Sequence, residues 1–126
     1  MNRYFRIARD ECLLSKNRVR FGAVLVIHSG LFVSAHNSHI KTHPLLLKHY
    51  PDFAMTAHAE MRCIALYNQY IRGPIPSRAV MYVYREDMNG NQKPARPCCG
   101  CRQILKLAGL SRIRYSTEFG FEEMRL

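Results

Sequence analysis

A chain of 126 residues has room for one compact domain and too few residues for two, so we expect a single domain over residues 1–126. Its 48% of apolar residues can form a core, but no apolar run approaches the roughly 18 residues of a membrane span. These features predict a soluble, cytoplasmic protein without a membrane partner. The net charge of +10 is compatible with a merely solvated surface, or with a nucleotide or nucleic-acid partner.

The predicted elements begin with a helix over residues 3–16, where apolar residues recur at helical spacing between arginines. A buried strand rich in β-branched residues follows over 21–27, and a tight turn leads to a return strand over 31–36. The pattern then weakens from residue 38 to residue 56. A loop of this length in a compact domain is usually a functional loop or a lid, and the alternative is an exposed excursion.

The second half alternates helices and strands. We expect a helix over 57–70, a strand over 79–84, a helix over 98–108 and a short strand over 113–116. A hairpin followed by helical crossovers predicts a mixed sheet whose later strands are parallel and whose two faces are covered by helices. The fold class is therefore α/β, with three α/β/α layers.

Three of the five cysteines lie within residues 98–101, next to Pro97. An odd count clustered in this way favours a metal site in a reducing compartment over a disulfide framework. Cys98 and Cys101 are three residues apart, so they share a face at the start of a helix, where the free N–H groups stabilise thiolates. Together with His58 they offer three zinc ligands and leave the fourth position for water, as in a catalytic site.

The sequence reads His-x-Glu at residues 58–60 and then Pro-Cys-x-x-Cys at residues 97–101. In this order the two motifs resemble those of the cytidine/deoxycytidylate deaminase superfamily, and the likeness extends from the first helix to the last predicted strand. The resemblance implies a zinc-dependent hydrolase with a cytidine-deaminase-like fold. Hydroxide formed on zinc would attack the ring carbon that carries the amine, and Glu60 would shuttle the protons.

The resemblance also suggests residues that contact the substrate. Asn37, at the end of the second strand, would bond the ribose or the base. The backbone around Ala59 would help to recognise the base, and the segment that begins at Phe21 would flank the pocket. In the long loop, Lys41 and His43 are candidates for binding a phosphate, with Arg18 and Arg20 before the first strand as further candidates, unless the loop is only solvated.

The substrate class stays open within the superfamily. Cys101-Arg102-Gln103 is similar to free cytidine deaminases, whereas His58 as the first ligand is similar to deoxycytidylate and tRNA adenosine deaminases. The mixture looks like the short deaminases of phages and bacteria. Our first candidate reaction is dCMP to dUMP, in a homo-oligomer that takes a small nucleotide. The alternatives are a deaminase of tRNA or single-stranded DNA, a purine mononucleotide deaminase, and a non-catalytic zinc-stabilised binding module, which would have no need of Glu60.

Overall fold

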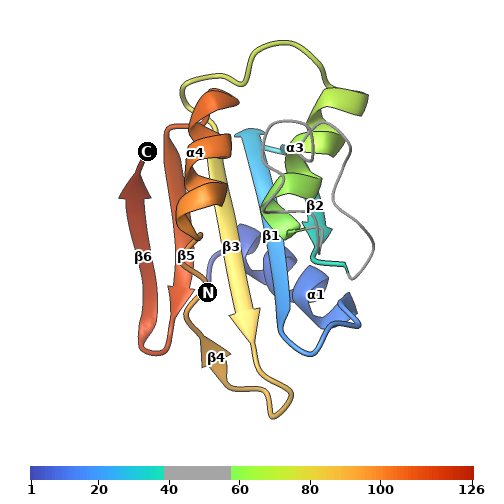
Figure 1. Cartoon of the computed structure of the whole chain (residues 1–126), viewed down its shortest axis with the longest axis vertical. Coiled ribbons are helices and arrows are strands. Elements are labelled where there is room, and N and C mark those ends of the chain that lie inside the picture. The colour runs from blue at the N-terminus through green and yellow to red at the C-terminus, as the bar shows by residue number, and fades with distance from the viewer. Residues whose placement is uncertain (39–57) are drawn as a thin grey trace.

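The computed structural model describes residues 1–38 and 58–126. The elements are α1 (Arg3–Leu14), β1 (Arg20–His28), β2 (Leu31–His36), α3 (Ala59–Tyr70), β3 (Val80–Glu86), β4 (Gln92–Lys93), α4 (Cys99–Leu107), β5 (Arg112–Thr117) and β6 (Gly120–Arg125). Figure 1 shows α3 and α4 side by side over one face of the sheet, with α1 behind it. The predicted three-layer α/β architecture is confirmed.

The sheet has the strand order β2-β1-β3-β5-β6, with β4 paired to β3. Strands β1 and β2 form the predicted antiparallel hairpin, and β3 pairs with β5 in parallel across the α4 crossover, also as predicted. Strand β3 lies beside β1 and runs antiparallel to it, from Arg20 opposite Glu86 to Val26 opposite Val80. The sheet is therefore mixed.

The strand β6 was not predicted from the sequence. Its residues, Gly-Phe-Glu-Glu-Met-Arg, contain no β-branched side chain and are largely polar, so they lack the usual strand pattern. The strand is formed by its pairing with β5, from Arg112 opposite Arg125 to Thr117 opposite Gly120. Glu123 adds ion pairs to the guanidinium groups of Arg112 at 2.7 Å and Arg114 at 3.0 Å. Tertiary contacts, and not local preference, create this edge strand.

Two buried clusters lie on opposite faces of the sheet. Alternating residues of β1 serve both, because Val24 faces the cluster with α1 while Leu25 faces the cluster with α3 and α4. The free thiols of Cys12 and Cys63 are fully buried, one in each cluster, as predicted. Within the described ranges, no helix has both the length and the apolarity needed to cross a membrane.

Candidate active site

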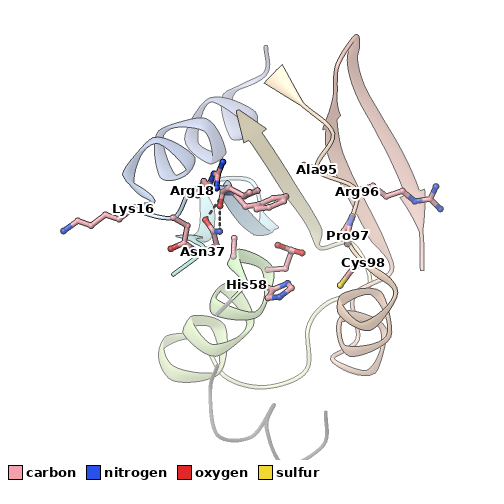
Figure 2. Close-up of a pocket in the computed structure, with 13 residues that line it drawn as sticks. Lys16, Arg18, Asn37, His58, Ala95, Arg96, Pro97 and Cys98 are labelled. Atoms are coloured by element: carbon pink, nitrogen blue, oxygen red, sulfur yellow. Dashed lines mark hydrogen bonds between the residues drawn. The ribbon is translucent and has the colours of Figure 1, made fainter. Parts of the chain in front are cut away.

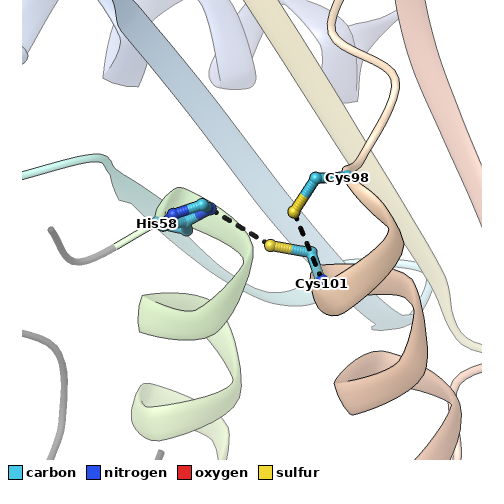
Figure 3. Close-up of side chains that lie close together, drawn as sticks. All are labelled: His58, Cys98 and Cys101. Atoms are coloured by element: carbon cyan, nitrogen blue, oxygen red, sulfur yellow. Dashed lines mark hydrogen bonds between the residues drawn. The ribbon is translucent and has the colours of Figure 1, made fainter. Parts of the chain in front are cut away.

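The side chains of His58, Cys98 and Cys101 come together where α3 and α4 begin (Figure 3). One ligand atom from each lies within 4.8 Å of the others. The Cys101 Sγ is 3.1 Å from the His58 Nδ1, and the Cys98 Sγ accepts a hydrogen bond from the Cys101 backbone N–H at 3.4 Å. The three residues that the sequence motifs selected thus form one cluster, although His58 precedes the two cysteines by 40 positions or more in the chain.

Helix geometry explains this convergence. His58 is the N-cap residue of α3, with extended backbone angles, and Cys98 is the N-cap residue of α4. Cys101 lies in the first turn of α4, so it shares the face of Cys98. Both helices therefore direct their positive N-terminal ends toward the cluster, which favours ionised thiolates there.

The donor set fits zinc. Bond lengths of about 2.3 Å to sulfur and about 2.0–2.1 Å to nitrogen place tetrahedral ligand atoms about 3.5–3.8 Å apart. The observed separations need only small side-chain adjustments to reach these values. Burial raises the pKa of the Cys101 thiol, and nearby Glu60 and Cys98 raise it further, so thiolates here call for a cation. Three protein ligands leave one coordination position open, as in catalytic zinc sites.

Glu60 lies in the first turn of α3, and only 5% of it is exposed. Burial raises the pKa of its carboxyl, and its own backbone N–H, His58 and Cys101 oppose this shift only in part. A buried carboxyl of raised pKa can both accept and return a proton near neutral pH, which is what general acid–base catalysis requires.

A cavity of about 660 Å³ opens beside this cluster. Figure 2 shows Asn37 near one side, Cys98 near the other, and His58 between them. The residues that line the cavity are Lys16, Asn17, Arg18, Val19, Phe21, Asn37, His58, Ala59, Glu60, Ala95, Arg96, Pro97 and Cys98. All three substrate-contact candidates within the described ranges, Phe21, Asn37 and Ala59, are among them.

Comparison with known families decides the assignment. The family model of the cytidine and deoxycytidylate deaminase zinc-binding region matches residues 1–117. The chain belongs to this family. The predicted superfamily is thereby confirmed, and with it a zinc-binding hydrolase fold of the deaminase kind.

A solved structure agrees with this membership. The deaminase fold superposes on the crystal structure of cytidine deaminase from Burkholderia pseudomallei with a TM-score of 0.68, over 99% of this chain and 93% of that chain. The sequence identity is 16%, so this likeness concerns the fold alone. No curated protein sequence matches the chain.

Arg18 and Arg20, the two candidates for binding a phosphate that the structure describes, have different surroundings. Arg18 lines the cavity, whereas Arg20 donates to the Asp87 carbonyl at 2.7 Å and lies 4.0 Å from the buried Glu86 carboxylate. Arg20 therefore has a structural role. Lys41 and His43 lie outside the described residues.

Sequence reasoning missed the residues that hold Asn37. The Asn37 Oδ1 accepts hydrogen bonds from the Ser15 hydroxyl at 2.7 Å and from the Phe21 N–H at 2.9 Å, and its Nδ2 donates to the Val19 carbonyl at 2.7 Å. Ser15 is also the C-cap residue of α1. A serine that ends a helix is a weak signal in sequence, because the same residue is common at such positions for local reasons.

Proposed function

We propose that this deaminase hydrolytically removes the amine from the base of a (deoxy)nucleotide, with dCMP to dUMP as the first candidate reaction. The observation that supports this proposal is the cavity that Glu60 shares with His58 and Cys98, beside Cys101. A structural zinc site has four protein ligands and no need of a buried carboxyl beside the metal. A reaction that moves protons between water, base and amine does need one.

In this proposal, His58, Cys98 and Cys101 hold zinc. Zinc, when bound, makes water acidic enough to supply hydroxide near pH 7. Glu60 takes a proton from the attacking water and passes it to the ring nitrogen beside the reacting carbon. It then delivers a proton to the departing ammonia, so that water and the amino base give ammonia and the keto base. Apolar residues, among them Ala59 and Pro97, line the same cavity as Glu60.

Cations around the cavity support a phosphorylated substrate. Lys16, Arg18 and Arg96 line it, and Glu60 is the one acidic residue among the lining residues of the described ranges. None of the three cations takes part in the ion pairs found between described residues. In Figure 2 the side chains of Lys16 and Arg96 extend outward, away from His58.

Arg18 is the cation that we favour for the phosphate. It directly precedes Val19, whose carbonyl accepts a hydrogen bond from the Asn37 amide at 2.7 Å, so it is the chain neighbour of a residue that holds the proposed substrate contact. Lys41 and His43 remain predictions for the same role.

The direct test is a panel of nucleosides, nucleotides and oligonucleotides, with ammonia release and the deaminated product measured. We expect turnover of dCMP with a higher kcat/KM than deoxycytidine. A charge-assisted bond contributes about 1.5–3 kcal/mol, so Arg18→Ala should lower kcat/KM for the monophosphate by about 10- to 100-fold and leave the nucleoside unaffected. Arg78→Ala is the matched control, because Arg78 is exposed and does not line the cavity.

Other outcomes of the panel would redirect the assignment. Equal kcat/KM values for the nucleoside and its monophosphate would rule out the proposed contact with the phosphate. Turnover of a purine monophosphate would change the base, and zinc binding without turnover of any substrate would support the non-catalytic module.

Activity on oligonucleotides alone would establish the second candidate, a polynucleotide deaminase. The distribution of charge along the chain supports this candidate, which we rank second to the mononucleotide deaminase. Residues 61–85 and 88–117 contain basic side chains and no acidic one, and they include α4 and most of α3.

A further inference from the structure

Strands β5 and β6 leave one side of the sheet open. Helix α1 packs on β1, β2 and β3, and it reaches β6 through the Phe5 ring, whose centroid is 4.0 Å from that of Phe121. Figure 1 shows β5 and β6 to one side of α1, at the edge of the sheet. Among the described elements, no helix therefore covers the α1 side of these two strands as α4 covers the other side.

The strand register shows which side chains lie on this open side. Residues directly opposite each other in an antiparallel pair share a face of the sheet. Arg112 is opposite Arg125, and Arg114 is opposite Glu123. Arg114 also donates to the Tyr82 hydroxyl at 3.0 Å, and Tyr82 belongs to the buried cluster beneath α1. These four charged side chains therefore project from the α1 side.

We call this surface the open face, and it has an excess of positive charge. Its residues are Arg112, Arg114, Phe121, Glu123 and Arg125. Three guanidinium groups against one carboxylate leave a net charge of +2. Glu123 is already shared between Arg112 and Arg114, and Arg125 takes part in none of the ion pairs found between described residues. The neighbouring Glu122 lies on the other side, where it accepts a hydrogen bond from the Tyr115 hydroxyl.

The stability of the hairpin does not account for this excess. Arg112 and Arg125 are like charges directly opposite each other, an arrangement that destabilises a strand pair. An acidic residue at position 125 would pair with Arg112 and support β6, which has little strand preference of its own. A second copy of the chain is a poor occupant, because it would bring two positive faces together. The charge of the open face fits a polyanion.

Exposed aromatic rings indicate which polyanion. Phe119, at the tip of the β5–β6 hairpin, is 97% exposed, and Phe121 on the open face is 40% exposed. Single exposed apolar residues are common, but rings beside arginines are what proteins use to bind single-stranded nucleic acids. The guanidinium groups bind phosphates and the rings stack on bases, which a duplex keeps stacked on one another. The six residues of β6 span about 20 Å, enough for several nucleotides.

We propose that the open face binds a single-stranded nucleic acid, with its arginines on the phosphates and with Phe119 and Phe121 against the bases. This inference goes beyond the proposed deamination and does not depend on it. The open face lies on the α1 side of the sheet, whereas α3 and α4, whose first residues form the metal cluster, lie on the opposite side. The bound strand is therefore a ligand at a site separate from the catalytic cavity.

The test measures binding of labelled oligothymidylate and oligouridylate to the zinc-loaded protein by fluorescence anisotropy. Neither base carries an exocyclic amine, so deamination cannot interfere. We expect the wild type to bind at least one of them with a Kd of about 1–100 μM at about 0.15 M salt. Three phosphate contacts should give a slope of log K against log salt of about −2.

Arg125→Glu is the decisive variant. It should weaken binding at least about 10-fold and bring the salt slope closer to zero by about 0.7, because one phosphate contact is lost. It should not lower Tm, since it places a carboxylate opposite Arg112. Phe119→Ala should weaken binding by about 5- to 100-fold, the contribution of one stacked base, and disturb no buried packing.

Controls separate the open face from the general positive charge of the protein. Arg72→Glu makes the same change of charge at an exposed position after α3, away from the open face, and should leave the affinity nearly unchanged. If Arg125→Glu does not fold, Arg125→Gln removes the same charge and should also weaken binding. Equal affinities of the Arg125 variant and Arg72→Glu would overturn the inference. Equally tight binding of a duplex of the same length, or equal competition by polyglutamate, would overturn it too, because neither ligand offers bases to the rings.

Discussion

Gly22 lies where α1 crosses β1, and we predict that Gly22→Ala is among the most damaging single changes to stability outside the metal cluster. A Cβ atom at this position would lie 1.9 Å from the Ala8 carbonyl oxygen and 2.5 Å from the Cys12 backbone nitrogen. Both atoms belong to the backbone of α1, so no side-chain rotation can relieve the contact. The helix as a whole must move.

The size of the effect follows from the distance. A carbon and a carbonyl oxygen in contact are about 3.3 Å apart. From a separation of 1.9 Å, α1 would have to move by about 1.4 Å. That movement separates Phe5, Ala8 and Cys12 from the sheet, and all three are buried. Overpacking of a core typically costs about 1–3 kcal/mol and occasionally more. We expect a loss of at least about 3 kcal/mol here, because the added Cβ clashes with backbone atoms of α1 and not with a movable side chain.

Thermal unfolding of the zinc-loaded protein, followed by circular dichroism, measures this cost. For a domain of this size about 3 kcal/mol corresponds to a fall in Tm of about 10–15 °C. Gly30→Ala is the matched control, because a Cβ there meets no atom within 4 Å and the cost comes only from its φ of +83°, about 1–2 kcal/mol. If Gly22→Ala melts no lower than Gly30→Ala, the close packing of α1 on β1 is not as described.

Two further predictions concern the metal cluster and its carboxyl. The wild type should contain one zinc per chain by elemental analysis, and Cys98→Ala and Cys101→Ala should lose it together with stability, since zinc binding is coupled to folding. Cys99→Ala, at an exposed position, should keep the metal, and full retention in both ligand variants would refute the ligand set. Glu60→Gln should fold and bind zinc while kcat falls by about 10²–10⁴-fold, the usual contribution of a general acid–base group. Near-normal turnover of Glu60→Gln would mean that another group moves the protons.

Much of this site could be predicted because its residues lie at the ends of strongly patterned elements. The apolar run of β1 and the helical spacing of α1 locate the sheet and one covering layer, and the two short motifs locate the starts of α3 and α4. Since a helix start fixes the direction of its first side chains, two motifs far apart in sequence were enough to predict one cluster.

What could not be predicted depends on tertiary pairing. The strand β6 forms on β5 despite a sequence with little strand preference. The bonds from Ser15 and Val19 to Asn37 join three segments whose approach no local pattern reveals. Arg18 and Arg20 are alike in sequence, and only the packing of Glu86 beneath Arg20 assigns one of them to structure and leaves the other at the cavity.

The two helix starts at the site also show how function departs from local stability. Serine, threonine, aspartate and asparagine are the preferred N-cap residues, and replacing them typically costs about 1 kcal/mol. Here the N-cap of α3 is His58, whose side chain makes no capping bond, and that of α4 is Cys98, which caps through sulfur at 3.4 Å. Neither choice is the best for its helix, but both place a ligand atom where the two positive helix ends meet. A metal at this point would hold the two helix starts together, so the stability that each cap gives up locally is recovered only when the site is assembled.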